Sequence, residues 1–191
     1  MAQISIAESR RLALERVRTV LAAQLGAEIT ASVAATSLAL ECPAPTGLFL
    51  QQTIDYTATA RAHSCFVVIA PDAPRRIVQA ASGGPSTYKA TSELDVAIAL
   101  AYQYRPQAPV SVGGVPLQAD ELMLRRGEVY LSALLNCLHK YLCDQVAVHD
   151  LTPISDVADV IAEDGFPAWG VAQLTLTLTQ LLAIPQRRPL P

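Results

Sequence analysis

The chain has 191 residues, enough for one domain with a substantial core, and a formal net charge of −3. Charged residues make up only 16% of it and apolar residues 51%, so few charges are available to cover a monomer surface. Either much of the polar surface consists of Thr, Ser and Gln, or part of the surface meets other chains, and we favour the second interpretation. It has no basic block, which argues against nucleic-acid binding as its main task, and no apolar run approaches the ~20 residues of a membrane helix.

The first residues show no secretion signal. Met1 to Ile6 lack the basic region and long apolar segment that a signal peptide needs. The four cysteines are not in CxxC spacing, and a chain of this size does not need disulfides for stability; they are Cys42, Cys65, Cys137 and Cys143. We therefore expect reduced thiols in a cytosolic setting.

The first predicted element is an amphipathic helix over residues 7–25. Its apolar side chains recur at helical spacing, at Leu14, Val17, Leu21 and Leu25. Gly26 follows directly and suits the position just beyond a helix end. Residues 27–41 are compatible with strand or helix, and Pro43 and Pro45 then stop regular structure.

Two short apolar segments indicate strands. Residues 64–70, SCFVVIA, form a run typical of a buried strand that ends at Pro71. We expect residues 75–81, RRIVQAA, to be its neighbour. The stretch from Ser82 to Ser86 contains Gly-Gly-Pro and indicates a loop.

A longer strand is predicted over residues 92–104, SELDVAIALAYQY. Large side chains and small alanines alternate with period two, which places them on opposite faces of a strand. The alanines are also compatible with a helix, but the alternation and the two tyrosines favour a strand.

A second long helix is predicted from Asp120 to about Cys143. It follows residues 106–117, where three prolines and Gly113-Gly114 indicate a loop or an arm. Its buried face is expected to consist of Leu124, Leu131, Leu134, Leu138 and Leu142. Charged side chains are expected off that face: Glu121, Arg125, Arg126, Glu128 and Lys140.

A third, short helix is predicted within residues 150–164, around SDVADVIAED. Ser155 is a candidate N-cap and Gly165 a candidate stop. Phe166 and Trp169 flank a proline and are expected to anchor the start of the last element.

The last element is a strand over residues 168–182, AWGVAQLTLTLTQLL, followed by a proline-rich tail, 185–191. Leucine and threonine alternate, so the leucines are expected in the core and the threonines on the opposite face. That face has two interpretations: it is solvated, or it meets a neighbouring subunit or lines a wet channel.

This order of elements predicts an α+β fold in which a mostly antiparallel sheet has two long helices packed on one face. We treat residues 1–191 as a single domain, with extended loops near 42–60, 82–91 and 106–117.

A catalytic site is the rival interpretation. Cys65 with His63 or His139 could serve as nucleophile and base, but Cys65 lies in a strongly apolar run, where a cysteine is usually inert. Cys137, His139 and Cys143 lack a fourth ligand nearby, so no metal site is predicted. Without a phosphate-binding glycine loop, no cofactor is predicted, and we do not expect an enzyme.

The pattern resembles bacteriophage tail terminator proteins, which cap the tail tube at its head-proximal end. The resemblance rests on the order of five segments, which loosely spans residues 5–184: the helix AESRRLALERVRTVL, the strand ELDVAIALAYQY, the Pro/Gly loop, the helix ADELMLRRGEVYLSALLNCLHKYL and the strand AWGVAQLTLTLTQLL. Segment 27–60 has no feature that matches the family, and neither has the loop 106–117 apart from its place in this order.

The resemblance implies a homo-oligomeric ring, with six subunits expected, that stops tube polymerisation and contacts the tail tube protein and a neck or connector protein. Its location would be the virion tail or neck, after assembly in the host cytoplasm. Ring contacts would map to the threonine face and to loops 82–91 and 106–117. The candidate interface residues are Gln173, Thr175, Thr177, Thr179, Arg187 and Arg188.

A third class is another virion protein, such as a head-completion, neck or tail-tube subunit. A tube subunit needs long paired hairpins to build an inner barrel, and two long helices favour the terminator instead. The form of the polymer would discriminate between them, since closed rings fit a terminator and open tubes fit a tube protein.

Overall fold

The computed structural model describes residues 6–54, 57–60, 62–72, 76–82, 87–142, 150–161 and 169–185. Its helices are α1 (Ile6–Thr36), α2 (Thr57–Ala60) and α3 (Ala119–Tyr141). The main sheet contains β1 (Leu48–Leu50), β2 (Cys65–Pro71), β3 (Arg76–Ser82), β4 (Thr87–Gln103), β7 (Asp150–Ile161) and β8 (Trp169–Pro185). A separate hairpin is formed by β5 (Ser111–Val112) and β6 (Val115–Pro116).

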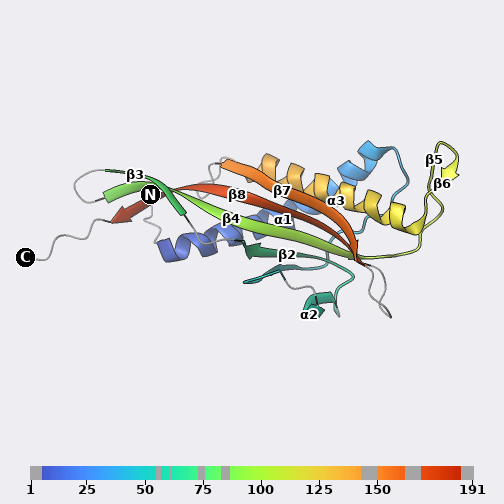
Figure 1. The fold of residues 1–191 in the computed structure, drawn as a ribbon, viewed down its shortest axis with the longest axis horizontal. Helices are drawn as coiled ribbons and strands as arrows, with labels where there is room; N and C mark the ends of the chain where they lie inside the picture. The colour runs from blue at the N-terminus through green and yellow to red at the C-terminus, as the bar shows by residue number, and fades with distance from the viewer. Residues whose placement is uncertain are drawn as a thin grey trace, which may run out of the picture.

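Two very long strands form the middle of the sheet. β4 and β8 have 17 residues each and pair antiparallel from Thr87↔Pro185 to Gln103↔Trp169. The strand order is β1-β2-β4-β8-β7, and β3 continues the edge of β4 beyond β2. Among the strands of the described residues, only β1 and β2 pair in parallel. Figure 1 shows the long, curved pair crossing the whole molecule.

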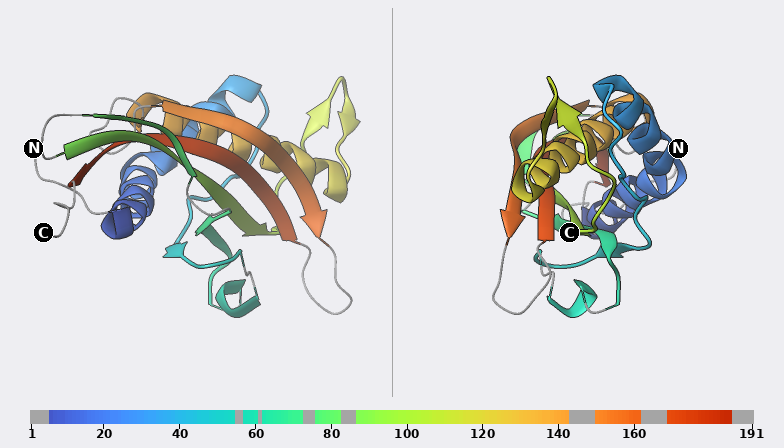
Figure 2. Two further views of the ribbon diagram at one scale, coloured as in Figure 1. Left: turned by 60° about the vertical axis from the view of Figure 1, so that its left-hand side comes forward. Right: turned by 90° about the vertical axis from the view of Figure 1, so that its right-hand side faces the viewer.

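The two long helices share one core with one face of this sheet. The largest buried cluster combines α1 and α3 side chains with alternate residues of β2, β4 and β8, among them Leu94, Ile98, Leu174, Leu176 and Leu178. Figure 2 shows the helices on one side of the curved sheet. The α+β fold, the mostly antiparallel sheet and the burial of the three leucines are therefore confirmed.

The expected end of the first helix at Gly26 is wrong. α1 continues to Thr36 because Ile29, 2% exposed, and the partly buried Val33 extend its buried face past the glycine. A glycine inside a helix costs about 1 kcal/mol relative to alanine. Burying two such side chains contributes more than that, so the helix continues.

The predicted short helix within 150–164 is also wrong. This segment is β7, which pairs antiparallel with β8 from Asp150↔Thr179 to Ile161↔Trp169, with a register shift after Pro153. The residue pattern that suggested a helix expresses only a local preference of this segment. Pairing with β8 supplies backbone hydrogen-bond partners to an edge that would otherwise lack them, and such tertiary pairing overrides a local preference.

The strand expected at 75–81 forms but has a different neighbour. β3 pairs with β4, along the stretch of β4 that β2 does not reach. Because β4 begins at Thr87, most of the loop expected at 82–91 is strand. The loop expected at 42–60 contains β1 and α2.

The buried face of α3 is rotated relative to the predicted leucine stripe. Leu134 and Leu138 are fully buried, but Leu124 is 43% exposed and Arg126, expected on the polar side, is 2% exposed. The face is set by the sheet and by α1, and it runs through Met123 and Tyr130. Leucine content alone did not identify it.

We expect Leu176→Ala to lower the free energy of unfolding by about 2–5 kcal/mol, because Leu176 is fully buried between sheet and helices. Thr179→Ala, on the other face of the same strand, should cost less than about 1 kcal/mol. Urea unfolding of both variants measures this, and a larger cost for Thr179→Ala than for Leu176→Ala would mean that the two faces are assigned the wrong way round.

Gly26→Ala should stabilise the protein by roughly 0.5–1 kcal/mol, because the position is helical and exposed. An added Cβ would meet only Ala44 Cβ, at 3.8 Å, which is an ordinary contact. A fall in the thermal midpoint would show that α1 is interrupted at this residue.

Candidate functional site

The segment between β4 and α3 forms a projecting hairpin, Ser111–Pro116, which we call the arm. Gly113 and Gly114 adopt φ of +59° and +84°, the left-handed values that a two-residue hairpin turn of this kind requires. All six residues are exposed, with Val112 at 47% and Val115 at 67%. The arm stands away from the body near the N-terminal end of α3 (Figures 1 and 2).

The base of the arm is fixed to the body. The Leu117 amide donates to the Val110 carbonyl at 2.8 Å and so closes the hairpin. Val110 is 7% exposed and packs in a buried cluster with Leu40, Leu122 and Val129. The arm therefore projects from a rigid base, with exposed apolar side chains at its tip.

A buried hydrogen-bond network lies beside this base. The Arg126 guanidinium donates to the Arg105 carbonyl at 3.0 Å and to Oε1 of Gln107. Gln107 Oε1 also accepts from the Glu41 amide at 2.9 Å, and its Nε2 donates to the Ala39 carbonyl at 3.0 Å. One glutamine thus connects α3 to the segments that follow β4 and α1.

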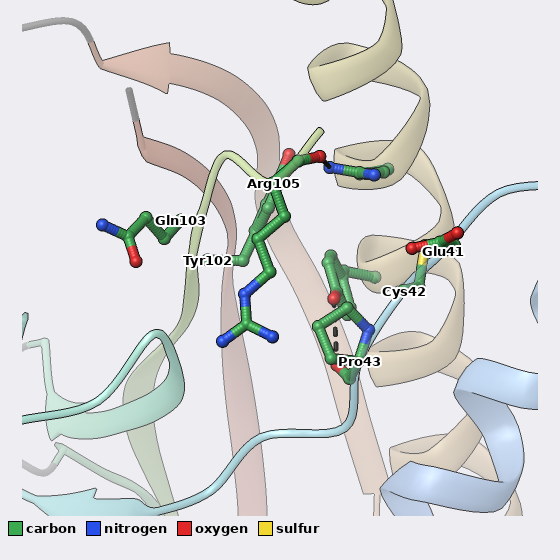
Figure 3. Close-up of a pocket in the computed structure, with 8 residues that line it drawn as sticks. Glu41, Cys42, Pro43, Tyr102, Gln103 and Arg105 are labelled. Atoms are coloured by element: carbon green, nitrogen blue, oxygen red, sulfur yellow. Dashed lines mark hydrogen bonds between the residues drawn. The ribbon is translucent and has the colours of Figure 1, made fainter. Parts of the chain in front are cut away.

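Arg126 also lines an open cavity of about 310 Å³. The other lining residues are Glu41, Cys42, Pro43, Tyr102, Gln103, Arg105 and Tyr130. In Figure 3 the Arg105 side chain extends across the space between Tyr102 and Pro43. The Tyr102 hydroxyl donates to the Met123 carbonyl at 2.6 Å and the Tyr130 hydroxyl to the Pro43 carbonyl at 2.9 Å.

Burial keeps the thiol and the two phenol groups of the cavity neutral. Desolvation raises the pKa of the Cys42 thiol to about 11, although Arg126 acts in the opposite direction. Desolvation likewise raises the pKa of Tyr102 and of Tyr130 above the ordinary value. At neutral pH the buried part of the cavity therefore carries the positive charge of Arg126, while two exposed residues of opposite charge type, Arg105 and Glu41, stand at its rim.

The threonine face of β8 is only partly available to a neighbour. Thr175 is 8% exposed, while Gln173, Thr177 and Thr179 are half-buried. Thr177 Oγ1 donates to Asp95 Oδ1 at 2.8 Å, from directly opposite on β4. Interactions within the chain thus already engage part of this face.

The Thr177–Asp95 bond continues as a polar row across three strands. Arg76 on β3 lies 3.1 Å from Asp95 Oδ2 and 3.3 Å from Glu93 Oε2. Asp95 is 6% exposed, so this carboxylate needs such partners. A charged side chain at position 177 would face the Asp95 carboxylate directly.

Arg187 and Arg188, the remaining candidate interface residues, lie outside the described residues.

The proposed thiol nucleophile has the wrong surroundings. Cys65 is 1% exposed, its Sγ donates to the Pro43 carbonyl at 3.5 Å, and burial raises the pKa of its thiol to about 12. His63 is bonded through Nδ1 to Thr46 Oγ1 at 2.9 Å instead. A nucleophilic cysteine needs a lowered pKa, so this arrangement does not activate Cys65.

The metal interpretation gains no support from the described part of the chain. Within it, no group of three or more His, Cys, Asp or Glu side chains is placed to hold a metal ion. Cys137 is fully buried with its thiol pKa raised to about 12, chiefly by desolvation, and Cys143 lies outside the described residues. None of the described helices is long and apolar enough to cross a membrane.

Two features of this end of the molecule were not predicted in full from the sequence. Residues 106–117 were expected as a loop or an arm, but not as a hairpin, although Val112-Gly-Gly-Val115 is a hairpin-turn pattern between two apolar residues. The burial of Arg126 had no signal in the sequence. Arg125, the adjacent arginine, lies in the same local sequence but is exposed and ion-paired with Glu128.

No protein-family model and no curated protein sequence matches this chain.

Replacement of Gln107 should destabilise the arm's base. We expect Gln107→Ala to lower the free energy of unfolding by about 2–4 kcal/mol, because it leaves the buried Arg126 and the Glu41 amide without their shared acceptor. Amide hydrogen exchange at Glu41 should accelerate as well. Unchanged exchange and stability would show that the network is not formed in solution.

Proposed function

We propose that this chain is a structural subunit that assembles into a closed ring, and that the ring is a bacteriophage tail terminator. The resemblance of its element order to that family supports the ring and suggests six copies. In this role the ring would stop growth of the tail tube and join it to a neck or connector protein.

The observation that carries the proposal is the arm. Val112 and Val115, 47% and 67% exposed, contribute little to the stability of a monomer beyond their mutual cross-strand contact, because apolar side chains stabilise a fold mainly through buried area. The arm is long enough to reach beyond its own body (Figure 2) and is rigid at its base. Such a hairpin is suited to pack against an adjacent copy.

This geometry is compatible with a head-to-tail arrangement. The arm lies near one end of α3, whereas the β3 end of the long β4–β8 pair lies at the other end of the molecule (Figure 1). A contact from the arm to a different surface of the next copy is heterologous, and repeated heterologous contacts close into a ring when the rotation permits. The low charge content is consistent with buried lateral surfaces.

A tail-tube, neck or head-completion subunit is the alternative structural role. The same arm could join subunits of an open tube, and the two long helices on one sheet face are what favours a terminator. Electron microscopy of the purified assembly separates the two, because rings of fixed size support the terminator and open tubes of variable length support a tube protein.

The test of the arm is Val115→Asp. The side chain is 67% exposed, so the monomer should fold with its thermal midpoint nearly unchanged. A charge at a packed interface should weaken association by at least about tenfold. Light scattering over a range of concentrations should show a discrete oligomer for the unmodified protein and a smaller species for the variant.

Ala23→Asp is the matched control, since it adds the same charge at an exposed position of α1. It should leave the mass unchanged. A monomer at every concentration for the unmodified protein, with and without tail tube protein, would contradict the proposal. So would an equal loss of mass in both variants.

A further inference from the structure

The cavity beside the arm's base contains a buried cation without a counter-ion. Arg126 is 2% exposed, and no carboxylate of the described residues lies within ion-pair distance of it. Its hydrogen bonds go to two neutral oxygens, the Arg105 carbonyl and Gln107 Oε1. A buried charge is normally paired, because its desolvation cost otherwise remains uncompensated.

Arg126 also has unused hydrogen-bonding capacity. A guanidinium has five N–H groups, and the side chain makes only the two bonds above among the described residues. Its Nε is buried and has no partner in that part of the chain. A fork of N–H groups matches the two oxygens of a carboxylate, and such charge-assisted bonds are about twice as strong as neutral ones.

The remaining surroundings of the cavity leave the buried guanidinium of Arg126 available to a negative group. Arg105 adds a second guanidinium at the rim, where its side chain also donates to Ser64 Oγ. Glu41 lines the same cavity but is not within ion-pair distance of either arginine. The tyrosine hydroxyls already donate to backbone carbonyls and stay neutral.

We propose that this cavity is a carboxylate-binding site, with Arg126 as the inner ligand and Arg105 as the outer one. At about 310 Å³ it is at the lower end of small-ligand pockets, so the group is a small carboxylic acid or one acidic side chain of a neighbouring protein chain. The site does not depend on the ring, because all of its residues belong to one chain.

The probe is succinate, titrated into the full-length protein at pH 7 and compared with sodium chloride at equal ionic strength. We expect saturable binding with a dissociation constant on the order of millimolar, and a thermal midpoint raised by about 4 °C at roughly twentyfold excess over it. Arg126→Gln should abolish the response. Because that change also alters a buried network, it is not the decisive variant.

Arg105→Gln is decisive, since the side chain is exposed and the carbonyl that holds Arg126 is retained. We expect it to weaken succinate binding about tenfold, the value of one charge-assisted bond. Arg125→Gln is the matched control: the neighbouring arginine is exposed, pairs with Glu128 and does not line the cavity, so binding should be unchanged.

Light scattering separates the two sources of the carboxylate. If an acidic side chain of a second copy occupies the cavity, saturating succinate and Arg105→Gln should each lower the oligomer mass. If the natural occupant is a free acid, both should leave the mass unchanged while succinate still binds. No saturable response in either readout, or equal binding by the unmodified protein and Arg105→Gln, would overturn the proposal. If Val115→Asp does not change assembly, the ring proposal is contradicted, but the carboxylate-binding site is not.

Discussion

The antiparallel pairing of β4 with β8 is the constraint on which the rest of the structure depends. These strands lie far apart in the sequence, yet they pair along all 17 residues of each. Every other main-sheet element attaches to this pair directly or through one strand: β2 and β3 along β4, β7 along β8, and β1 on β2. Their register also decides which side chains meet the helices, because a one-residue slip would expose every buried leucine.

The two faces of this pair have different consequences. The face toward α1 and α3 forms the apolar core, with Leu94, Ile98, Leu174 and Leu176 all fully buried. The other face carries a polar row and a small apolar cluster, in which Phe66 packs edge-on against Trp169 with ring centroids 5.9 Å apart. A threonine face can therefore stabilise its own chain, and alternation alone does not assign it to a partner.

The end of the molecule near the arm combines rigidity with unused interaction capacity. Val110 and the Gln107 network fix the base, while Val112 and Val115 remain exposed. Arg126 is costly to bury for a purely structural role, since a neutral side chain could fill the same space. Placing a recognition group and a rigid arm side by side concentrates at this end the features that a partner or ligand could use.

The sequence alone determined the elements whose patterns are strong and local. The period-two alternation in β4 and β8 and the helical spacing in α1 and α3 indicated element type and, for Leu174 to Leu178, the buried face. Tertiary structure decided what local pattern leaves ambiguous. β7 is a strand because β8 offers it an edge, α1 passes Gly26 because its buried face continues, and Arg126 is buried while Arg125 is not because the sheet and α1 set the rotation of α3. Contacts between residues distant in sequence supply these energies, so no local window of the sequence contains them.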